Sequence, residues 1–136
     1  MSQESNYITT NRSKHYLKCH LIFVCKYRKQ MLTGQLNEDA KCIFLRIACF
    51  SDFEIEVMET DKDHVHFLIR YIPRWSIAQI VRRLKQESAR QLWQLHGSLL
   101  RKQYWYQELF WSDGYFVCSI GEASPETIRQ YILSQG

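Results

Sequence analysis

The sequence has no long apolar run, no internal repeat and no linker rich in proline or glycine. Its apolar stretches are shorter than the roughly 20 residues that a membrane-spanning helix needs, and the polar residues 1–12 lack the apolar segment of a signal peptide. With 136 residues, we expect one domain spanning 1–136, its segment 1–13 poorly ordered. These absences exclude a membrane protein and favour the cytoplasm.

The sequence also has no C-x-x-C motif. Its cysteines are odd in number and scattered, at positions 19, 25, 42, 49 and 118. This pattern argues against a disulfide framework and against a structural zinc site. We expect buried free thiols.

Basic residues are in slight excess, giving a net charge of +4. One cluster contains Arg82, Arg83, Lys85 and Arg90. Lys26, Arg28 and Lys29 form another, and aromatic residues make up 14% of the chain. Phosphates attract positive charge and unpaired bases stack on aromatic rings, so this composition suits single-stranded nucleic acid. We expect the first cluster to line the path of such a strand.

The hydrophobic pattern predicts four strands and three helices. Strands are expected at 16–27, 53–58, 64–71 and 115–120. Helices are expected at 36–50, from a capping box at Ser76 to Gly97, and from Ser124-Pro125 to the C-terminus. The order β-α-β-β-α-β followed by a helix predicts an α+β, ferredoxin-like antiparallel sheet with helices on one face.

Two histidines lie in the third of these strands. Side chains of a strand alternate between its faces, so His64 and His66 point to the same side, while Val65 and Phe67 point to the other. Neutral imidazole is a common ligand of divalent metals. The pair therefore forms half of a metal site on the open face, whereas His15, His20 and His96 show no ligand spacing and are expected to be surface or hydrogen-bonded residues.

The terminal helix carries two further candidate residues. Tyr131 and Gln135 are four residues apart and so share one helix face. The phenolic oxygen of Tyr131 is a candidate nucleophile. The amide oxygen of Gln135 is a suitable ligand for a hard cation such as Mg²⁺ or Mn²⁺.

Three segments together resemble the signatures of the single-tyrosine HUH transposases, which move small insertion sequences as single-stranded DNA. They are DHVHFLI at 63–69, WSDGYFVCSIG at 111–121 and YILSQG at 131–136. The resemblance covers nearly the whole chain. It implies that His64, His66 and Gln135 bind the metal and that Tyr131 is the nucleophile. It also implies a prokaryotic homodimer with composite active sites, acting on single-stranded DNA with hairpin ends.

The resemblance implies the following chemistry. Tyr131 attacks a phosphodiester and a 3′-hydroxyl leaves, which gives a 5′-phosphotyrosine and conserves the bond energy without ATP. The absence of a G-x-x-x-x-G-K-[ST] phosphate loop agrees with this. The chain ends at Gly136, directly after the glutamine, so the tyrosine helix is short, about eleven residues. We expect it to dock on the body or on a partner.

Three alternatives stay open. A non-catalytic module binding single-stranded nucleic acid would place aromatic residues at the centre of the open sheet face. A hydrolytic metalloenzyme would need further ligands, for which Asp61 and Asp63 are candidates. A domesticated repeat-associated tyrosine transposase would share the chemistry and differ in its biological role.

Overall fold

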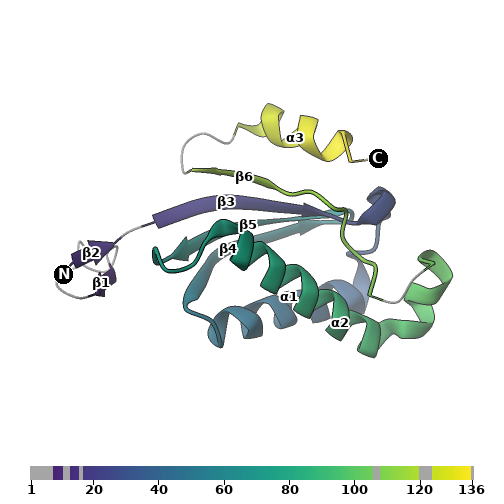
Figure 1. Ribbon diagram of the computed structural model, residues 1–136. Coiled ribbons are helices and arrows are strands. Elements are labelled where there is room, and N and C mark those ends of the chain that lie inside the picture. The colour runs from purple at the N-terminus through teal and green to yellow at the C-terminus, as the bar shows by residue number, and fades with distance from the viewer. Residues whose placement is uncertain (1–7, 11–12, 16, 106–107, 120–123, 136) are drawn as a thin grey trace.

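The computed structural model describes residues 8–10, 13–15, 17–105, 108–119 and 124–135 (Figure 1). The elements are β1 (Ile8–Thr10), β2 (Ser13–His15), β3 (Leu17–Val24), the short 3-10 helix η2 (Lys26–Arg28), α1 (Gly34–Cys49), β4 (Phe53–Asp61), β5 (His64–Tyr71), α2 (Ile77–Gln103), β6 (Phe116–Ser119) and α3 (Pro125–Leu133). In the N-terminal segment, β1 pairs with β2, and residues 1–7 and 11–12 lie outside the described residues.

The main sheet has the order β4-β5-β3-β6, with every neighbouring pair antiparallel. The strand with the two histidines, β5, lies between β4 and β3. Val24 is opposite His64 and Ile22 is opposite His66 in the β3–β5 ladder. This order confirms the predicted ferredoxin-like arrangement and places the histidine pair on an interior strand.

The principal core lies between one face of the sheet and the helices α1 and α2 (Figure 1). Alternate residues of β5, namely Val65, Phe67 and Ile69, are completely buried there. The apolar face of α1 is buried in the same core and includes Leu36, Ala40, Ile43, Phe44 and Ile47. The apolar residues that recur every second position in the strand and about every 3.6 positions in the helix therefore pack into one core.

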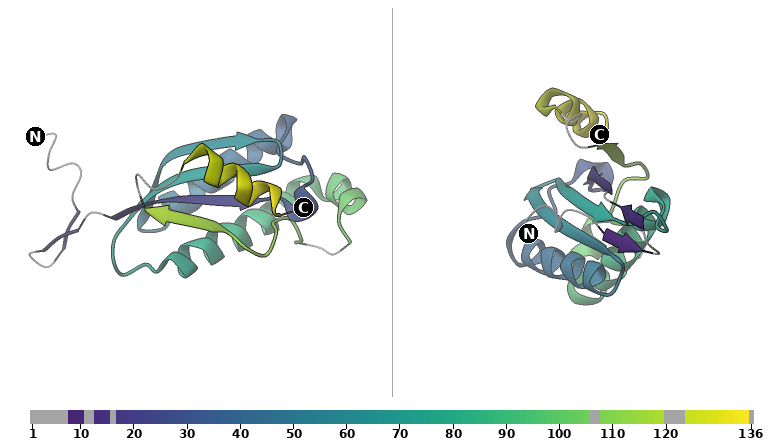
Figure 2. Two further views of the ribbon diagram at one scale, coloured as in Figure 1. Left: turned by 90° about the horizontal axis from the view of Figure 1, so that it is seen from above. Right: turned by 90° about the vertical axis from the view of Figure 1, so that its left-hand side faces the viewer.

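The opposite face of the sheet is covered by α3, whose axis runs obliquely across the strands (Figures 1 and 2). Ile22 and Val24 point to this face and are completely buried, although they lie outside the principal core. No side chain of α3 is itself fully buried. The helix thus covers the sheet with half-buried side chains only.

The predicted starts of α2 and α3 are confirmed by their caps, whereas α1 begins at Gly34, two residues before its predicted start. The backbone N–H of Gln79 donates to Ser76 Oγ at 3.1 Å, and the N–H of Ser76 donates to Gln79 Oε1 at 2.9 Å. At α3, the N–H of Thr127 donates to Ser124 Oγ at 3.1 Å, with Pro125 in the first turn. Both side chains satisfy N–H groups that lack a partner within the helix.

The predicted end of α2 at Gly97 is wrong, because the helix continues to Gln103. It kinks at His96, where φ is −126° and ψ is 32°. His96 Nε2 lies 2.7 Å from Asp39 Oδ2 of α1, and Leu100 is completely buried. The contact of His96 with Asp39 and the burial of Leu100 therefore stabilise the last helical turns of α2, although Gly97 by itself disfavours a helix.

The strand bounds also differ at their ends. β4 extends to Asp61 rather than residue 58, because Asp61 pairs with His64. The predicted last strand, 115–120, is described as Phe116–Ser119, and residue 120 lies outside the described residues.

The cysteines form no disulfide, and all five lie in the described part of the chain. Cys19 and Cys25 are buried as expected, and Cys118 is half-buried. Cys42 and Cys49 are exposed, which contradicts the expectation of buried thiols, because both lie on α1 outside its apolar face. Among the helices of the described ranges, none is both long and apolar enough to cross a bilayer.

Candidate active site

His64 is held by the residue before it. Its Nδ1 lies 3.0 Å from Asp63 Oδ1, and the side chain is half-buried. A carboxylate at Nδ1 favours the tautomer with the proton on that nitrogen, which leaves Nε2 as the lone-pair donor. This carboxylate–histidine pair is the arrangement that usually supports a metal-binding imidazole.

His66 contacts a third histidine. His20 of β3 faces it with Nδ1 at 2.9 Å from His66 Nε2, and the two rings stack with centroids 5.1 Å apart. Glu59 Oε1 lies 3.8 Å from the other nitrogen, Nδ1. Burial, followed by the charge of His20, lowers the pKa of His66. The ring is therefore neutral at neutral pH, the form that binds a metal.

The sequence analysis did not assign His20 to the site, although the expectation that it is hydrogen-bonded is confirmed. Its even position in β3 puts it on the face of Ile22, and Ile22 is opposite His66. The neighbourhood of His20 and His66 follows from the pairing register between β3 and β5. It could not be predicted from the sequence, because the sequence alone does not give that register.

A groove of about 780 Å³ separates the histidine pair from α3. One wall is formed by His64 and His66 with the neighbouring residues of β4, Glu59, Thr60 and Asp61. The other wall belongs to α3 and consists of Pro125, Ile128, Arg129 and Ile132. The two histidines therefore face the helix that carries the predicted nucleophile.

Tyr131 itself lies outside the set of residues that line this groove. Its ring packs 5.7 Å from that of Phe116 on β6, and a Cβ placed on Gly114 would lie 3.7 Å from its Oη. Its hydroxyl is buried and finds no hydrogen-bond partner among the residues that the structure describes, and burial raises the pKa of Tyr131 to about 12. In this arrangement the phenol is protonated at neutral pH.

The prediction that the last helix runs to the C-terminus is wrong: α3 ends at Leu133, so Gln135 lies beyond it and shares no helix face with Tyr131. Gln135 is also absent from the groove lining, and its Nε2 donates to Ser134 Oγ at 3.2 Å. Within the described ranges, no three His, Cys, Asp or Glu side chains are grouped so that they could hold a metal ion. One chain in this arrangement therefore brings together two of the three predicted ligands, His64 and His66.

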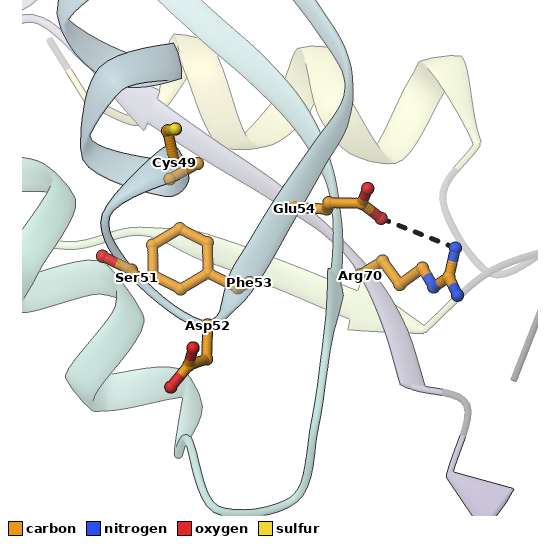
Figure 3. A pocket seen from close by; sticks show the side chains of 7 residues that line it. Cys49, Ser51, Asp52, Phe53, Glu54 and Arg70 are labelled. Carbon is orange, nitrogen blue, oxygen red and sulfur yellow. Dashed lines mark ion pairs between the residues drawn. The ribbon is translucent and has the colours of Figure 1, made fainter. Parts of the chain in front are cut away.

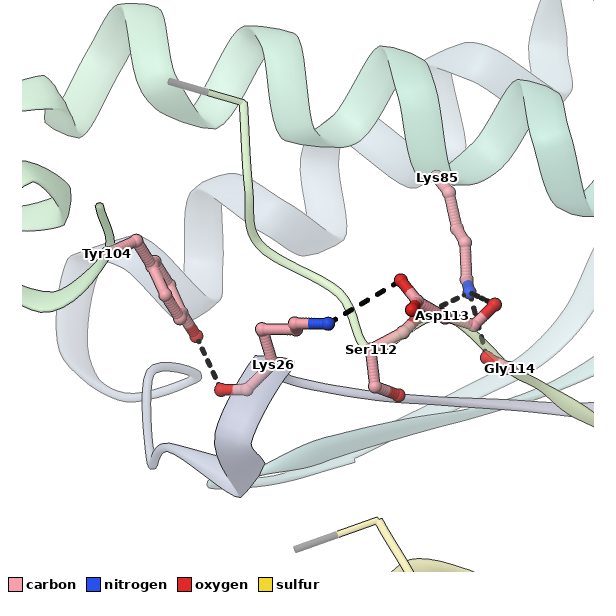
Figure 4. Close-up of polar contacts among 6 residues, drawn as sticks. All are labelled: Lys26, Lys85, Tyr104, Ser112, Asp113 and Gly114. Carbon is pink, nitrogen blue, oxygen red and sulfur yellow. Dashed lines mark hydrogen bonds and ion pairs between the residues drawn. The ribbon is translucent and has the colours of Figure 1, made fainter. Parts of the chain in front are cut away.

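The segment around Gly114, against which Tyr131 rests, is held from the other side of β6 by Lys85 (Figure 4). Its Nζ donates to the carbonyl oxygens of Ser112, Asp113 and Gly114 at 2.7, 3.3 and 2.8 Å. Burial lowers the pKa of the Lys85 ammonium to about 8. Lys26 adds an ion pair to the Asp113 carboxylate at 3.5 Å.

The four basic residues predicted to contact DNA lie on α2, across the sheet from the histidine pair (Figure 1). Besides Lys85, Arg83 is already engaged, since its Nε donates to Ser51 Oγ at 2.6 Å. Arg90 is exposed and pairs with Glu87 at 2.6 Å, and Arg82 is exposed. The structure thus does not bring this cluster together with the candidate metal ligands, and its contact with DNA stays a prediction.

A separate pocket of about 380 Å³ lies where α1 turns into β4 (Figure 3). Its polar lining includes the ion pair between Arg70 and Glu54, at 3.5 Å. Phe53 in this pocket pairs with Tyr71, at the end of the β4–β5 hairpin remote from His64. None of the predicted site residues lines it.

The family model of the IS200-like transposases matches residues 13–135. The chain belongs to this family. It is 34% identical to the ISDra2 transposase TnpA of Deinococcus radiodurans over 121 residues, which cover 89% of this chain and 85% of that protein. It is 30% identical over 118 residues to the transposase for insertion sequence element IS200 of Salmonella typhimurium, covering 87% and 76%.

Solved structures support the same assignment for this IS200-like transposase. A crystal structure described as that of a transposase from Deinococcus radiodurans superimposes with a TM-score of 0.84 at 32% identity, covering 94% of this chain and 98% of that one. A repeat-associated (REP) tyrosine transposase, solved with a REP hairpin bound, gives a TM-score of 0.55 at 14% identity. The superposition covers 92% of this chain and 68% of that one. The second likeness shows a shared fold.

Proposed function

We propose that this IS200-like transposase cleaves and rejoins single-stranded DNA through a covalent bond between Tyr131 and a 5′-phosphate. The observation that carries the proposal is the groove between β5 and α3. It has His64 and His66 on one wall, and its other wall is the helix that bears Tyr131. The proposed location is the cytoplasm of a prokaryotic cell.

His64 and His66 would hold a divalent cation, Mg²⁺ or Mn²⁺, with the Gln135 amide oxygen as the third protein ligand. The hydrogen bond from His64 to Asp63 and the neutral state of His66 fit this use. Such a cation, when bound, withdraws charge from the scissile phosphate and orients it.

In the proposed reaction, the phenolic oxygen of Tyr131 bonds to phosphorus and the bond from phosphorus to the 3′-oxygen breaks. The phenolic proton ends on the departing 3′-hydroxyl. One phosphodiester replaces another, so the step is reversible, and a second 3′-hydroxyl can displace the tyrosine to join new ends.

The position of Tyr131 supports a movement of α3 before the reaction. The hydroxyl rests beside Gly114, with its pKa raised to about 12, instead of lining the groove. We propose that the protein is a homodimer and that α3 of one subunit completes the histidine pair of the other.

The open sheet face argues against a purely nucleic-acid-binding module. Such a module would stack bases on aromatic rings at the centre of the sheet, whereas this face carries His20, His64 and His66 on β3 and β5. A domesticated transposase remains a second candidate because a repeat-associated tyrosine transposase shares the fold. That protein was solved with a hairpin, and we propose hairpin-bearing single strands as the substrate here too.

The test is to incubate the protein and Mg²⁺ with single-stranded element ends labelled at either the 3′ or the 5′ end. A 5′-phosphotyrosine predicts that the 3′-labelled strand becomes attached to the protein and survives denaturing electrophoresis. The 5′-labelled strand should be released as a shorter free product. No adduct at all, or an adduct with the 5′-labelled fragment, would contradict the proposal.

A further inference from the structure

The most exposed large ring in the described part of the chain belongs to Trp105, which is 88% exposed and follows the end of α2. A tryptophan in this position loses apolar contact with the core and gains none. It lines an open pocket of about 380 Å³ together with Arg101, Lys102, Gln103 and Tyr104. The indole ring therefore lies in an open pocket that is also lined by two basic side chains.

A second exposed ring stands on the neighbouring segment. Tyr27 of η2 is 51% exposed, and its ring centroid lies 6.3 Å from that of Tyr104. Tyr104 is buried, and its hydroxyl donates to the Lys26 carbonyl oxygen at 3.2 Å (Figure 4). Lys29 Nζ donates to Gln103 Oε1 at 3.3 Å. These contacts join residues 26–29 to the end of α2, so the two exposed rings stand on two segments that are bonded to each other.

The backbone of η2 is strained. Tyr27 and Arg28 have φ values of 61° and 54°, in the left-handed region that side chains with a Cβ rarely adopt. Such strain, about 1–2 kcal/mol per residue, is typical of functional sites. Here it accompanies the outward position of the Tyr27 ring.

Positive charge surrounds both rings. Arg28, Lys29, Arg101 and Lys102 flank them, and Glu108 lies in the adjoining pocket with Arg101. Arg28 Nη1 also donates to the Leu133 carbonyl oxygen at the end of α3, at 3.4 Å. η2, the end of α2 and the end of α3 lie at one end of the molecule (Figures 1 and 2). A strand held on this surface would thus reach the tyrosine helix.

We infer that Trp105 and Tyr27, with Arg28, Lys29, Arg101 and Lys102, form a binding site for an unpaired segment of DNA next to the cleaved bond. The rings stack on exposed bases and the cations contact phosphates, the combination that binds single strands without reading their sequence. This stacking site rests on the proposed function and adds to it the path by which the strand enters. A second copy of the chain fits the site less well, because the surface repels another surface of the same positive charge.

The first experiment measures intrinsic fluorescence while an oligothymidine of about ten nucleotides is added, a length comparable to that which a single-strand-binding OB-fold contacts. Stacking should quench Trp105, because Trp93 and Trp111 are buried and the half-buried Trp75 packs edge-on against Phe53 in the core. Trp105→Phe should abolish most of the quenching and keep most of the affinity.

The second experiment compares affinities by fluorescence anisotropy of the labelled oligonucleotide. Trp105→Ala should bind about 5- to 150-fold more weakly, the range for the loss of one stacked base. The matched control is Phe50→Ala, since Phe50 is 76% exposed at the end of α1 and should leave the affinity unchanged. Duplex DNA, which offers no free base faces, should bind Trp105→Ala as it binds the parent protein.

The two proposals fail differently. If the parent protein neither binds the single strand nor forms the adduct, the proposed function is overturned. If the parent protein does both and Trp105→Ala keeps full affinity, only the stacking site is overturned. Loss of self-association in Trp105→Ala at unchanged DNA affinity would also overturn it, in favour of a contact between copies of the chain.

Discussion

The hydroxyl of Tyr131 combines two properties that are costly in a resting protein: it is buried, and within the described residues it has no hydrogen-bond partner. A buried polar group without a partner destabilises the fold by about 1–3 kcal/mol. The same burial raises its pKa to about 12, which keeps the phenol protonated. In this position the Tyr131 side chain is thus buried and protonated.

Tyr131→Phe keeps the ring that packs on Phe116 and removes only the unpaired hydroxyl. We expect no covalent adduct, unchanged binding of the hairpin, and a free energy of unfolding that is unchanged or up to about 1 kcal/mol higher. Denaturant titration and the adduct assay check this. An adduct that persists would identify another nucleophile, and Tyr115→Phe serves as the control from the same region.

The histidine pair allows a test that does not depend on cleavage. His64→Ala and His66→Ala should each weaken Mn²⁺ binding by at least about tenfold and abolish the adduct. Both side chains are half-buried, so we expect a change in unfolding free energy of about 1 kcal/mol or less. Mn²⁺ titration followed by electron paramagnetic resonance measures binding directly. Full binding in the double variant would remove the metal site from these residues.

At the scale of elements, Lys85 links α2 to the segment before β6 through three carbonyl groups. Lys85→Met keeps most of the apolar stem and loses these hydrogen bonds. We expect a loss of about 1–3 kcal/mol in unfolding free energy, since the carbonyl of the buried Ser112 loses its donor, whereas those of the exposed Asp113 and Gly114 can bond water. Arg82→Met on the same helix is the matched control and should change it by about 0.5 kcal/mol or less. Equal effects of the two variants would show that the Lys85 contacts are dispensable.

The exposed cations of α2 give a different prediction. If Arg82 and Arg90 contact phosphates, replacing both with alanine should flatten the dependence of affinity on salt by about 1.4 in a plot of log K against log salt. Binding of single strands at several salt concentrations measures this slope. An unchanged slope would leave both residues as solvated surface. That result would leave the stacking site at η2 and the end of α2 unaffected.

Local sequence signals predicted the elements well where side-chain chemistry acts within a few residues. The capping residues Ser76 and Ser124 identified both helix starts, and strand alternation separated the histidines from Val65 and Phe67. The end of α2 could not be predicted in this way, because His96 is bonded to Asp39 of another helix. The contact of His20 with His66 depends on strand register, and the engagement of Lys85 depends on a distant segment.

Strand alternation predicted that His64 and His66 share one face, but the arrangement of the rest of the candidate site could not be predicted. The pattern of residues 131–136 predicts Tyr131 and Gln135 as site residues, whereas neither lines the groove in the structure. Their distance from the groove depends on how α3 lies on the sheet, which is decided by its packing against Phe116 and Gly114. The spacing of residues along the sequence carries no information on that packing.

At the scale of the whole molecule, the proposed dimer can be tested by mixing inactive variants. Tyr131→Phe supplies intact histidines and His64→Ala supplies an intact tyrosine. If sites are shared between subunits, an equal mixture should form about a quarter of the parental adduct, because half of the dimers are mixed and each has one intact site. Subunit exchange is verified beforehand with two affinity tags. No adduct despite proven exchange would assign each site to a single chain.

The limited burial of α3 affects the free energy of moving this helix. The helix covers Ile22 and Val24 without burying any side chain of its own completely. In a symmetric dimer, the sheet surface that α3 covers in one subunit would be identical in the other subunit. A reciprocal swap of the two helices would then break and re-form the same contacts, so the two arrangements would be almost equal in free energy. A substrate that prefers one arrangement by only about 1.4 kcal/mol would populate it tenfold, which makes the DNA itself sufficient to drive the exchange.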